Sequence, residues 1–108
     1  MPFKVLLTYD TTRDLEELYE YISLHDMPEK ANHVLDKIES IFTGLSEFPE
    51  RGTFPKELLA LGIRDYREIF FKPYRIIYRV SSKNVYVFLI VDGRRDMQSL
   101  LQRRLLEA

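Results

Sequence analysis

The chain has 108 residues, of which 45% are hydrophobic and 31% charged, with a net charge of −1; this is ordinary for a globular domain and excludes a disordered chain. It has no cysteine, which excludes disulfides, thiolate metal sites and a cysteine nucleophile, and no apolar run near the roughly 20 residues that span a bilayer. We therefore expect a single domain, residues 1–108, located in the cytoplasm, with no membrane segment, metal or cofactor.

The first half of the chain predicts a strand followed by a helical hairpin. Phe3–Tyr9 is an apolar run of strand length. Asp10 and the two threonines after it offer N-cap oxygens for a helix that runs to about His25. A second helix begins near Pro28 and ends around Ser46. Because the link between them is short, the two helices form an antiparallel hairpin, and its apolar stripes are expected to pack on a sheet.

Residues 64–96 predict a three-stranded meander. Its strands are about Tyr66–Phe71, Tyr74–Val80 and Val85–Val91, separated by short breaks that contain proline, serine and asparagine. Proline cannot donate to a ladder, and serine and asparagine favour turns. Links this short permit only antiparallel pairing.

Alternation along the last two strands predicts the face that each side chain occupies. In the second strand, one face holds Ile76, Tyr78 and Val80, and the other holds Arg75, Ile77 and Arg79. In the third strand, one face holds Val85, Val87, Leu89 and Val91, and the other holds Tyr86, Phe88 and Ile90. Both faces of the third strand should therefore be covered, and the arginines of the second should lie exposed beside a partial cover.

The remaining segments complete an α+β fold. A loop with two prolines and a glycine spans Phe48–Pro55, one helical turn follows at Lys56–Leu61, and Asp96 caps a last helix through about Leu106. The order β-α-α-β-β-β(-α) predicts a helical hairpin packed on a small, mostly antiparallel sheet. The pairing of the first strand stays open, since a helical crossover permits a parallel partner within the meander.

The charge is distributed unevenly along the chain. Residues 1–50 contain 4 Lys and Arg against 11 Asp and Glu, whereas residues 51–108 contain 12 against 6. This asymmetry fits a basic working surface in the second half of the chain. It fits equally a dipolar surface that only aids solubility.

The order of elements and three short motifs resemble the RelE/ParE toxins of bacterial type II toxin–antitoxin systems. The motifs are Phe48-Pro49 with Gly52, the strand Tyr74–Val80, and Gly93–Asp96, and the resemblance covers essentially the whole chain. It implies one scaffold with two activities. RelE-like members are ribosome-dependent ribonucleases that cut mRNA, and ParE-like members inhibit DNA gyrase without a reaction of their own. Both are silenced by a cognate antitoxin.

The residues that a RelE-like nuclease would need are only partly present. Arg67, Arg75 and Arg95 stand where the resemblance implies cations that hold the phosphate. Ile69 falls where a lysine would lie, and no His or Tyr follows Tyr86. Since RNA cleavage needs a proton acceptor and a proton donor, and arginine is a poor base, the acid–base groups are largely missing.

The sequence therefore predicts a ParE-type toxin of a plasmid stabilisation system, which inhibits DNA gyrase, is not an enzyme and is neutralised by its antitoxin. The alternatives are a RelE-type mRNA interferase, acting on ribosome and mRNA, and a degenerate member without toxicity. A homodimer is a further expected form of the free toxin. The residues expected to bind the target or the antitoxin are Arg75, Ile77, Arg79, Phe88, Arg94 and Arg95.

These residues also have plainer explanations. Arg75 and Arg79 fit an ordinary exposed sheet face. Arg94 and Arg95 fit a role in capping carbonyl groups or in pairing with neighbouring aspartates.

Overall fold

A four-stranded mixed sheet in the order β1-β4-β3-β2 carries the fold of the computed structural model, which describes residues 2–107. Its strands are β1 (Lys4–Leu7), β2 (Arg67–Phe71), β3 (Tyr74–Ser81) and β4 (Asn84–Asp92). β2, β3 and β4 pair antiparallel, and β1 joins β4 in parallel. The predicted meander is confirmed, and the first strand takes the parallel partner that its helical crossover permits.

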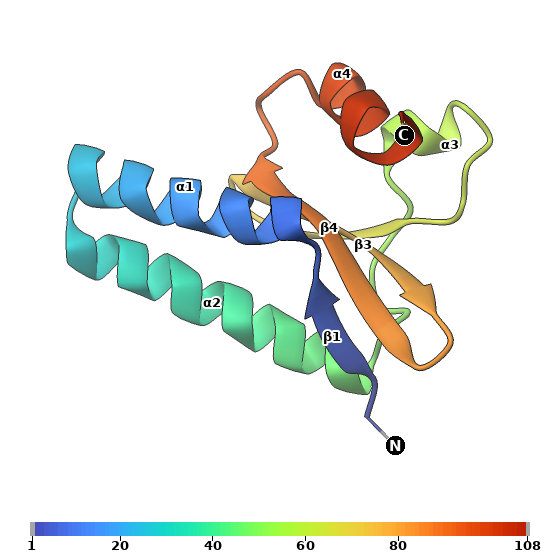
Figure 1. Cartoon of the computed structure of the whole chain (residues 1–108), viewed down its shortest axis with the longest axis horizontal. Helices are drawn as coiled ribbons and strands as arrows, with labels where there is room; N and C mark the ends of the chain where they lie inside the picture. Colours follow the sequence, from blue (N-terminus) through green and yellow to red (C-terminus); the bar gives the residue numbers. More distant parts are fainter. Residues whose placement is uncertain (1, 108) are drawn as a thin grey trace.

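Helices cover both faces of this sheet (Figure 1). The long hairpin of α1 (Tyr9–His25) and α2 (Pro28–Glu47) lies on one side. The short α3 (Lys56–Leu59) and the last helix, α4 (Met97–Leu101) with its π-helical continuation η1 (Gln102–Leu106), lie on the other. The α+β class and the order of elements are confirmed. No helix within residues 2–107 is long and apolar enough to cross a membrane.

The helix starts follow the capping rules, with one difference from the prediction. The Asp96 carboxylate accepts from the backbone N–H of Ser99 at 3.2 Å, as expected for an N-cap. The N-cap of α1 is Thr8 rather than Asp10, because the Thr8 hydroxyl accepts from the N–H of Thr11 at 3.1 Å. The helix therefore begins immediately after β1.

The two sides of the sheet form two apolar cores. The hairpin side is built around Ile22, Ala31, Val34, Ile38, Leu45, Ile76, Tyr78, Val85, Val87 and Ile90. The opposite side is built around Leu58, Tyr66, Ile77, Leu89, Val91, Met97, Leu100 and Leu101. β3 and β4 are covered on both faces, so these two strands hold the protein together.

A β-bulge at Phe88 interrupts the pairing of β3 with β4. Ile77 pairs with Leu89, and its neighbour Tyr78 pairs with Val87. Phe88 is therefore an extra residue that has no partner of its own in β3.

The bulge reverses the alternation of side chains along β4. Val85 and Val87 face the hairpin, whereas Leu89 and Val91 face α4. The prediction that all four lie on one face is wrong, because the extra residue Phe88 shifts the period by one position.

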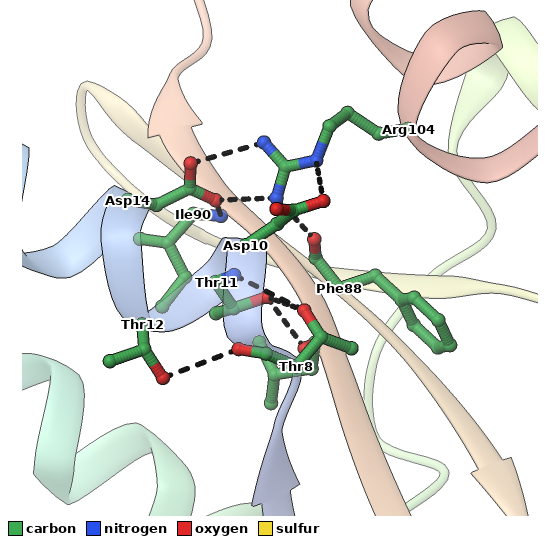
Figure 2. A network of polar contacts seen from close by, with 9 residues as sticks. Thr8, Asp10, Thr11, Thr12, Asp14, Phe88, Ile90 and Arg104 are labelled. Carbon is green, nitrogen blue, oxygen red and sulfur yellow. Dashed lines mark hydrogen bonds and ion pairs between the residues drawn. The ribbon is translucent and has the colours of Figure 1, made fainter.

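Thr11 anchors α1 to the sheet beside the bulge (Figure 2). Its side chain is fully buried, and its hydroxyl donates to the backbone carbonyl of Val87 at 2.7 Å. The same carbonyl also accepts from the backbone N–H of Thr8 at 3.2 Å, so Thr11 adds a second donor just after the end of β1.

We expect Thr11→Val to destabilise the protein by about 1–2 kcal/mol, because the Val87 carbonyl and the Thr8 hydroxyl lose a partner within the core. Urea unfolding measures the change. Thr12→Val is the matched control, since its exposed hydroxyl bonds only the preceding turn of the same helix. Equal losses in the two variants would contradict the anchoring role.

Candidate functional site

Arg75 lies in an ion triad with Glu57 and Glu68. Its Nε donates to Glu68 Oε1 at 2.7 Å, and its two terminal nitrogens donate to the Glu57 oxygens at 2.7 and 2.8 Å. The side chains of Arg75 and Glu68 are only 5% and 4% exposed. The predicted exposure of Arg75 is wrong, because α3 and β2 each bring a carboxylate to it.

Gly93 completes the enclosure of Arg75. A Cβ atom at this position would lie 2.7 Å from Arg75 Cδ, so only glycine lets the chain after β4 pass over the arginine stem. The glycine of the Gly93–Asp96 motif is thus a packing requirement of the triad.

The two carboxylates of the triad differ in their titration. Hydrogen bonds from Arg75 lower the pKa of Glu57 below its ordinary value, while burial raises the pKa of Glu68. The hydrogen bond to Glu57 raises the pKa of Arg75, which therefore stays charged. The Arg75 guanidinium is therefore committed to these two carboxylates.

Arg94 and Arg95 lie exposed where the chain leaves β4. The Arg94 guanidinium pairs with Asp92, the last residue of β4, with Nε donating to Oδ1 at 2.9 Å, and this pair lowers the pKa of Asp92. The Arg95 guanidinium forms none of the hydrogen bonds or ion pairs found within residues 2–107. The plainer explanation therefore applies to Arg94, and Arg95 has its guanidinium available for a partner.

Both arginines border a hollow of about 500 Å³ between α1 and the end of β4. Leu18, Tyr21, Tyr74 and Ile90 contribute the apolar part of its lining. Asp14, Glu17 and Asp92 add acidic groups beside Arg94 and Arg95. A groove with apolar walls and charges of both signs suits an amphipathic protein segment.

The other three predicted site residues lie apart from this hollow. Ile77 is fully buried against α4, so its predicted exposure is wrong: the last helix folds over that face of the sheet. Phe88 is half-buried and packs edge-on against Tyr66, with ring centroids 5.6 Å apart. Arg79 is exposed, with a loose ion pair to Asp65 at 3.8 Å.

Arg104 is the structural residue that the sequence did not reveal. Its guanidinium donates to both Asp14 oxygens at 3.1 and 3.0 Å and to the Phe88 carbonyl at 2.8 Å (Figure 2). Asp14 also accepts from the backbone N–H of Ile90 at 3.1 Å. These two side chains thus form hydrogen bonds with backbone groups of β4 at an edge that β1 no longer covers. No local signal could find this pair, because 90 positions separate its members.

Residues 2–107 contain no group of three or more His, Asp or Glu side chains able to hold a metal ion. The candidate site is therefore described by its arginines and its amphipathic hollow.

Comparisons with known proteins agree on one family. The model of the family described as "ParE toxin of type II toxin-antitoxin system, parDE" matches residues 5–97. The chain is 28% identical over 101 residues to Toxin ParE3 of Caulobacter vibrioides, covering 94% of this chain and 97% of that protein. A solved structure described as the chromosomal ParDE system from P. aeruginosa superposes with a TM-score of 0.69 at 18% identity, over 83% of this chain and 95% of that one, and supports the fold.

We expect Arg104→Met to destabilise the protein by about 2–3 kcal/mol, because Asp14 and the Phe88 carbonyl both lose a charged donor in a poorly solvated place. Urea unfolding measures the loss. Arg103→Met, at an exposed neighbouring position, is the matched control and should change stability little. A small effect of Arg104→Met would show that the bulge is stable without its charged cover.

We expect Glu57→Gln to cost about 2 kcal/mol at neutral pH, where it removes a charged acceptor from Arg75. Because the folded protein lowers the Glu57 pKa, this stabilisation is present above the ordinary value of 4.5 and is lost as pH falls through the lowered pKa. Urea unfolding across this pH range should therefore show the variant and the wild type converging in acid. Glu20→Gln, on the exposed face of α1, serves as the control without such convergence.

Proposed function

The chain belongs to the ParE toxin family of type II toxin–antitoxin systems, and we propose that it inhibits DNA gyrase by binding, without a reaction of its own, and is neutralised by a cognate antitoxin. The observation that carries the non-enzymatic part is the enclosure of Arg75 by Glu57 and Glu68. A nuclease needs this arginine to stabilise the phosphorane, and an arginine held by two carboxylates is not free for that task.

The positions of the three candidate nuclease residues support the same proposal. Arg67 pairs with Tyr78 in the ladder, so its side chain leaves β2 on the hairpin side of the sheet, opposite to the side taken by Arg75. Its guanidinium donates to the carbonyls of Gly52 and Glu50 at 2.9 and 3.2 Å. Of the three, only Arg95 is left with an uncommitted guanidinium, and one cation without a proton acceptor does not make a ribonuclease.

For the interaction with gyrase we favour the exposed cations at the end of β4, chiefly Arg95, with Arg94 beside it. Arg79 pairs with Tyr86 toward the other end of β4 and is not part of this surface. For the antitoxin we favour the amphipathic hollow between α1 and β4, lined by Leu18, Tyr21 and Ile90. Ile77 and Arg75 are not contacts in this proposal, because they are buried. A cytoplasmic location follows from the proposed target, and a homodimer of the free toxin stays a prediction.

Two assays on the purified protein test the proposal: gyrase supercoiling of a plasmid, and mRNA integrity on translating ribosomes. We expect supercoiling to stop while the mRNA stays intact. Cut mRNA with normal supercoiling would overturn the proposal in favour of an mRNA interferase. No effect in either assay would favour a family member that has lost its toxicity.

We expect Arg95→Ala to raise the concentration needed for half-inhibition of gyrase about tenfold, as for loss of one good interface contact. Its stability should stay unchanged, because the guanidinium has no partner within residues 2–107. Lys83→Ala, on the exposed turn between β3 and β4, is the control and should inhibit as the wild type does. Unchanged inhibition by Arg95→Ala would remove this residue from the target surface.

A further inference from the structure

We propose that the surface beside the outer edge of β2 binds unpaired, single-stranded DNA, with Phe54 and Phe70 as stacking platforms and Lys56 and Lys72 as phosphate contacts. This site does not include Arg95 and shares only Arg94 with the lining of the antitoxin hollow. The choice of DNA over RNA rests on the proposed action on gyrase, since neither the rings nor the ammonium groups read a 2′-hydroxyl.

Three segments distant in the sequence meet at this surface. The loop before α3, the turn between β2 and β3, and the link after β4 enclose a hollow of about 550 Å³. Thr53 pairs with Glu68 through backbone hydrogen bonds of 3.1 and 2.7 Å, and the Gly93 N–H donates to the Pro73 carbonyl at 2.8 Å. The walls are therefore fixed by main-chain contacts, and the hollow is a built feature of the fold.

Two aromatic rings flank the hollow, and an arginine guanidinium lies near each ring. Phe70 is 59% exposed although it belongs to a strand, and the Arg75 guanidinium carbon lies 5.4 Å from its ring centroid. The Arg67 guanidinium carbon lies 4.6 Å from the ring centroid of Phe54, and that of Arg64 lies 5.8 Å from it. Phe54 is only partly exposed, so Phe70 is the main ring on which a base can stack, with Phe54 beside it.

The charge around the rings favours a polyanion. Lys56 and Lys72 are exposed and form no ion pair within the described residues, and Arg94 completes the rim. The nearest acids, Glu57 and Glu68, are already engaged by Arg75. Cations interleaved with open aromatic rings are the combination that proteins use to hold single strands without sequence preference.

The test is fluorescence anisotropy of a labelled oligothymidine of about 12 nucleotides titrated with the full chain. We expect binding that weakens about sevenfold between about 50 and 200 mM salt, because the two lysines neutralise about two phosphates. A duplex of the same length should bind more weakly, since its bases are already stacked. No binding of the single strand at low salt would overturn the proposal.

Two variants separate the stacking from the charge. Phe70→Ala should weaken binding about tenfold, and the double variant Lys56→Ala with Lys72→Ala should flatten the salt dependence. Phe48→Ala removes another exposed ring, 63% accessible at the end of α2, and Lys83→Ala another exposed lysine. Both controls should bind as the wild type does, and equal losses in variants and controls would overturn the site. Circular dichroism checks that each variant is folded.

Two competitors define the class of ligand. If oligouridine binds and oligothymidine does not, the assignment to DNA is overturned. If polyglutamate displaces the oligonucleotide from wild type and Phe70→Ala alike, the surface recognises acidic charge alone and the stacking platform is overturned.

The outcome is independent of the gyrase assay, because the oligonucleotide is titrated with the protein alone. Gyrase inhibition without oligonucleotide binding would overturn the proposed DNA site and leave the proposed action on gyrase standing. Oligonucleotide binding without gyrase inhibition would support it while removing the proposed target.

Discussion

The β-bulge at Phe88 and the polar groups that close it are the constraint on which the rest of the structure depends. Because of the extra residue, Leu89 and Val91 lie in the core beneath α4, whereas Val85 and Val87 before it lie in the hairpin core. The change leaves backbone groups at an uncovered edge. Thr11, Asp14 and Arg104 satisfy these groups from two helices at opposite ends of the chain. An orphaned buried amide or carbonyl costs more than an ordinary hydrogen bond contributes, so the bulge requires these partners.

The bulge also decides what the protein presents to others. Leu89 and Val91 draw α4 onto the second face of the sheet, and α4 in turn buries Ile77. Arg104, in the π-helical continuation η1, then ties the end of the chain's last helix to α1. Exposed apolar side chains remain at the outer edge of the sheet, where Phe70 lies, and at the far end of the helical hairpin, at Tyr21, Leu24 and Met27.

The sequence predicted the order and type of the elements because each depends on near neighbours. Hydrophobic periodicity, proline positions and the Asp96 cap all act within a few residues. The prediction failed where residues far apart in the sequence determine which face a side chain occupies or whether it is buried. The run Val85–Val91 is apolar at every position, so it fits either face and cannot reveal a bulge. The burial of Arg75 depends on Glu57, 18 positions away, and Arg104 meets Asp14 across 90 positions. A charged residue is usually exposed, but it can be buried when an opposite charge from a distant part of the chain pairs with it.

The charged residues of this protein fall into two groups: those buried in ion pairs, such as Arg75, and the cations exposed to water. A buried arginine between two acids adds little net stability compared with a well-packed apolar cluster, because desolvation offsets much of the attraction. Its effect is geometric: Glu57 holds α3 on the sheet, and α3 places Leu58 under the last helix. The cations that stay in water, such as Arg95, Lys56 and Lys72, make no such contribution and are available for a partner. In the proposed function, the two carboxylates keep Arg75 from binding a phosphate, and the exposed cations contact the partners instead.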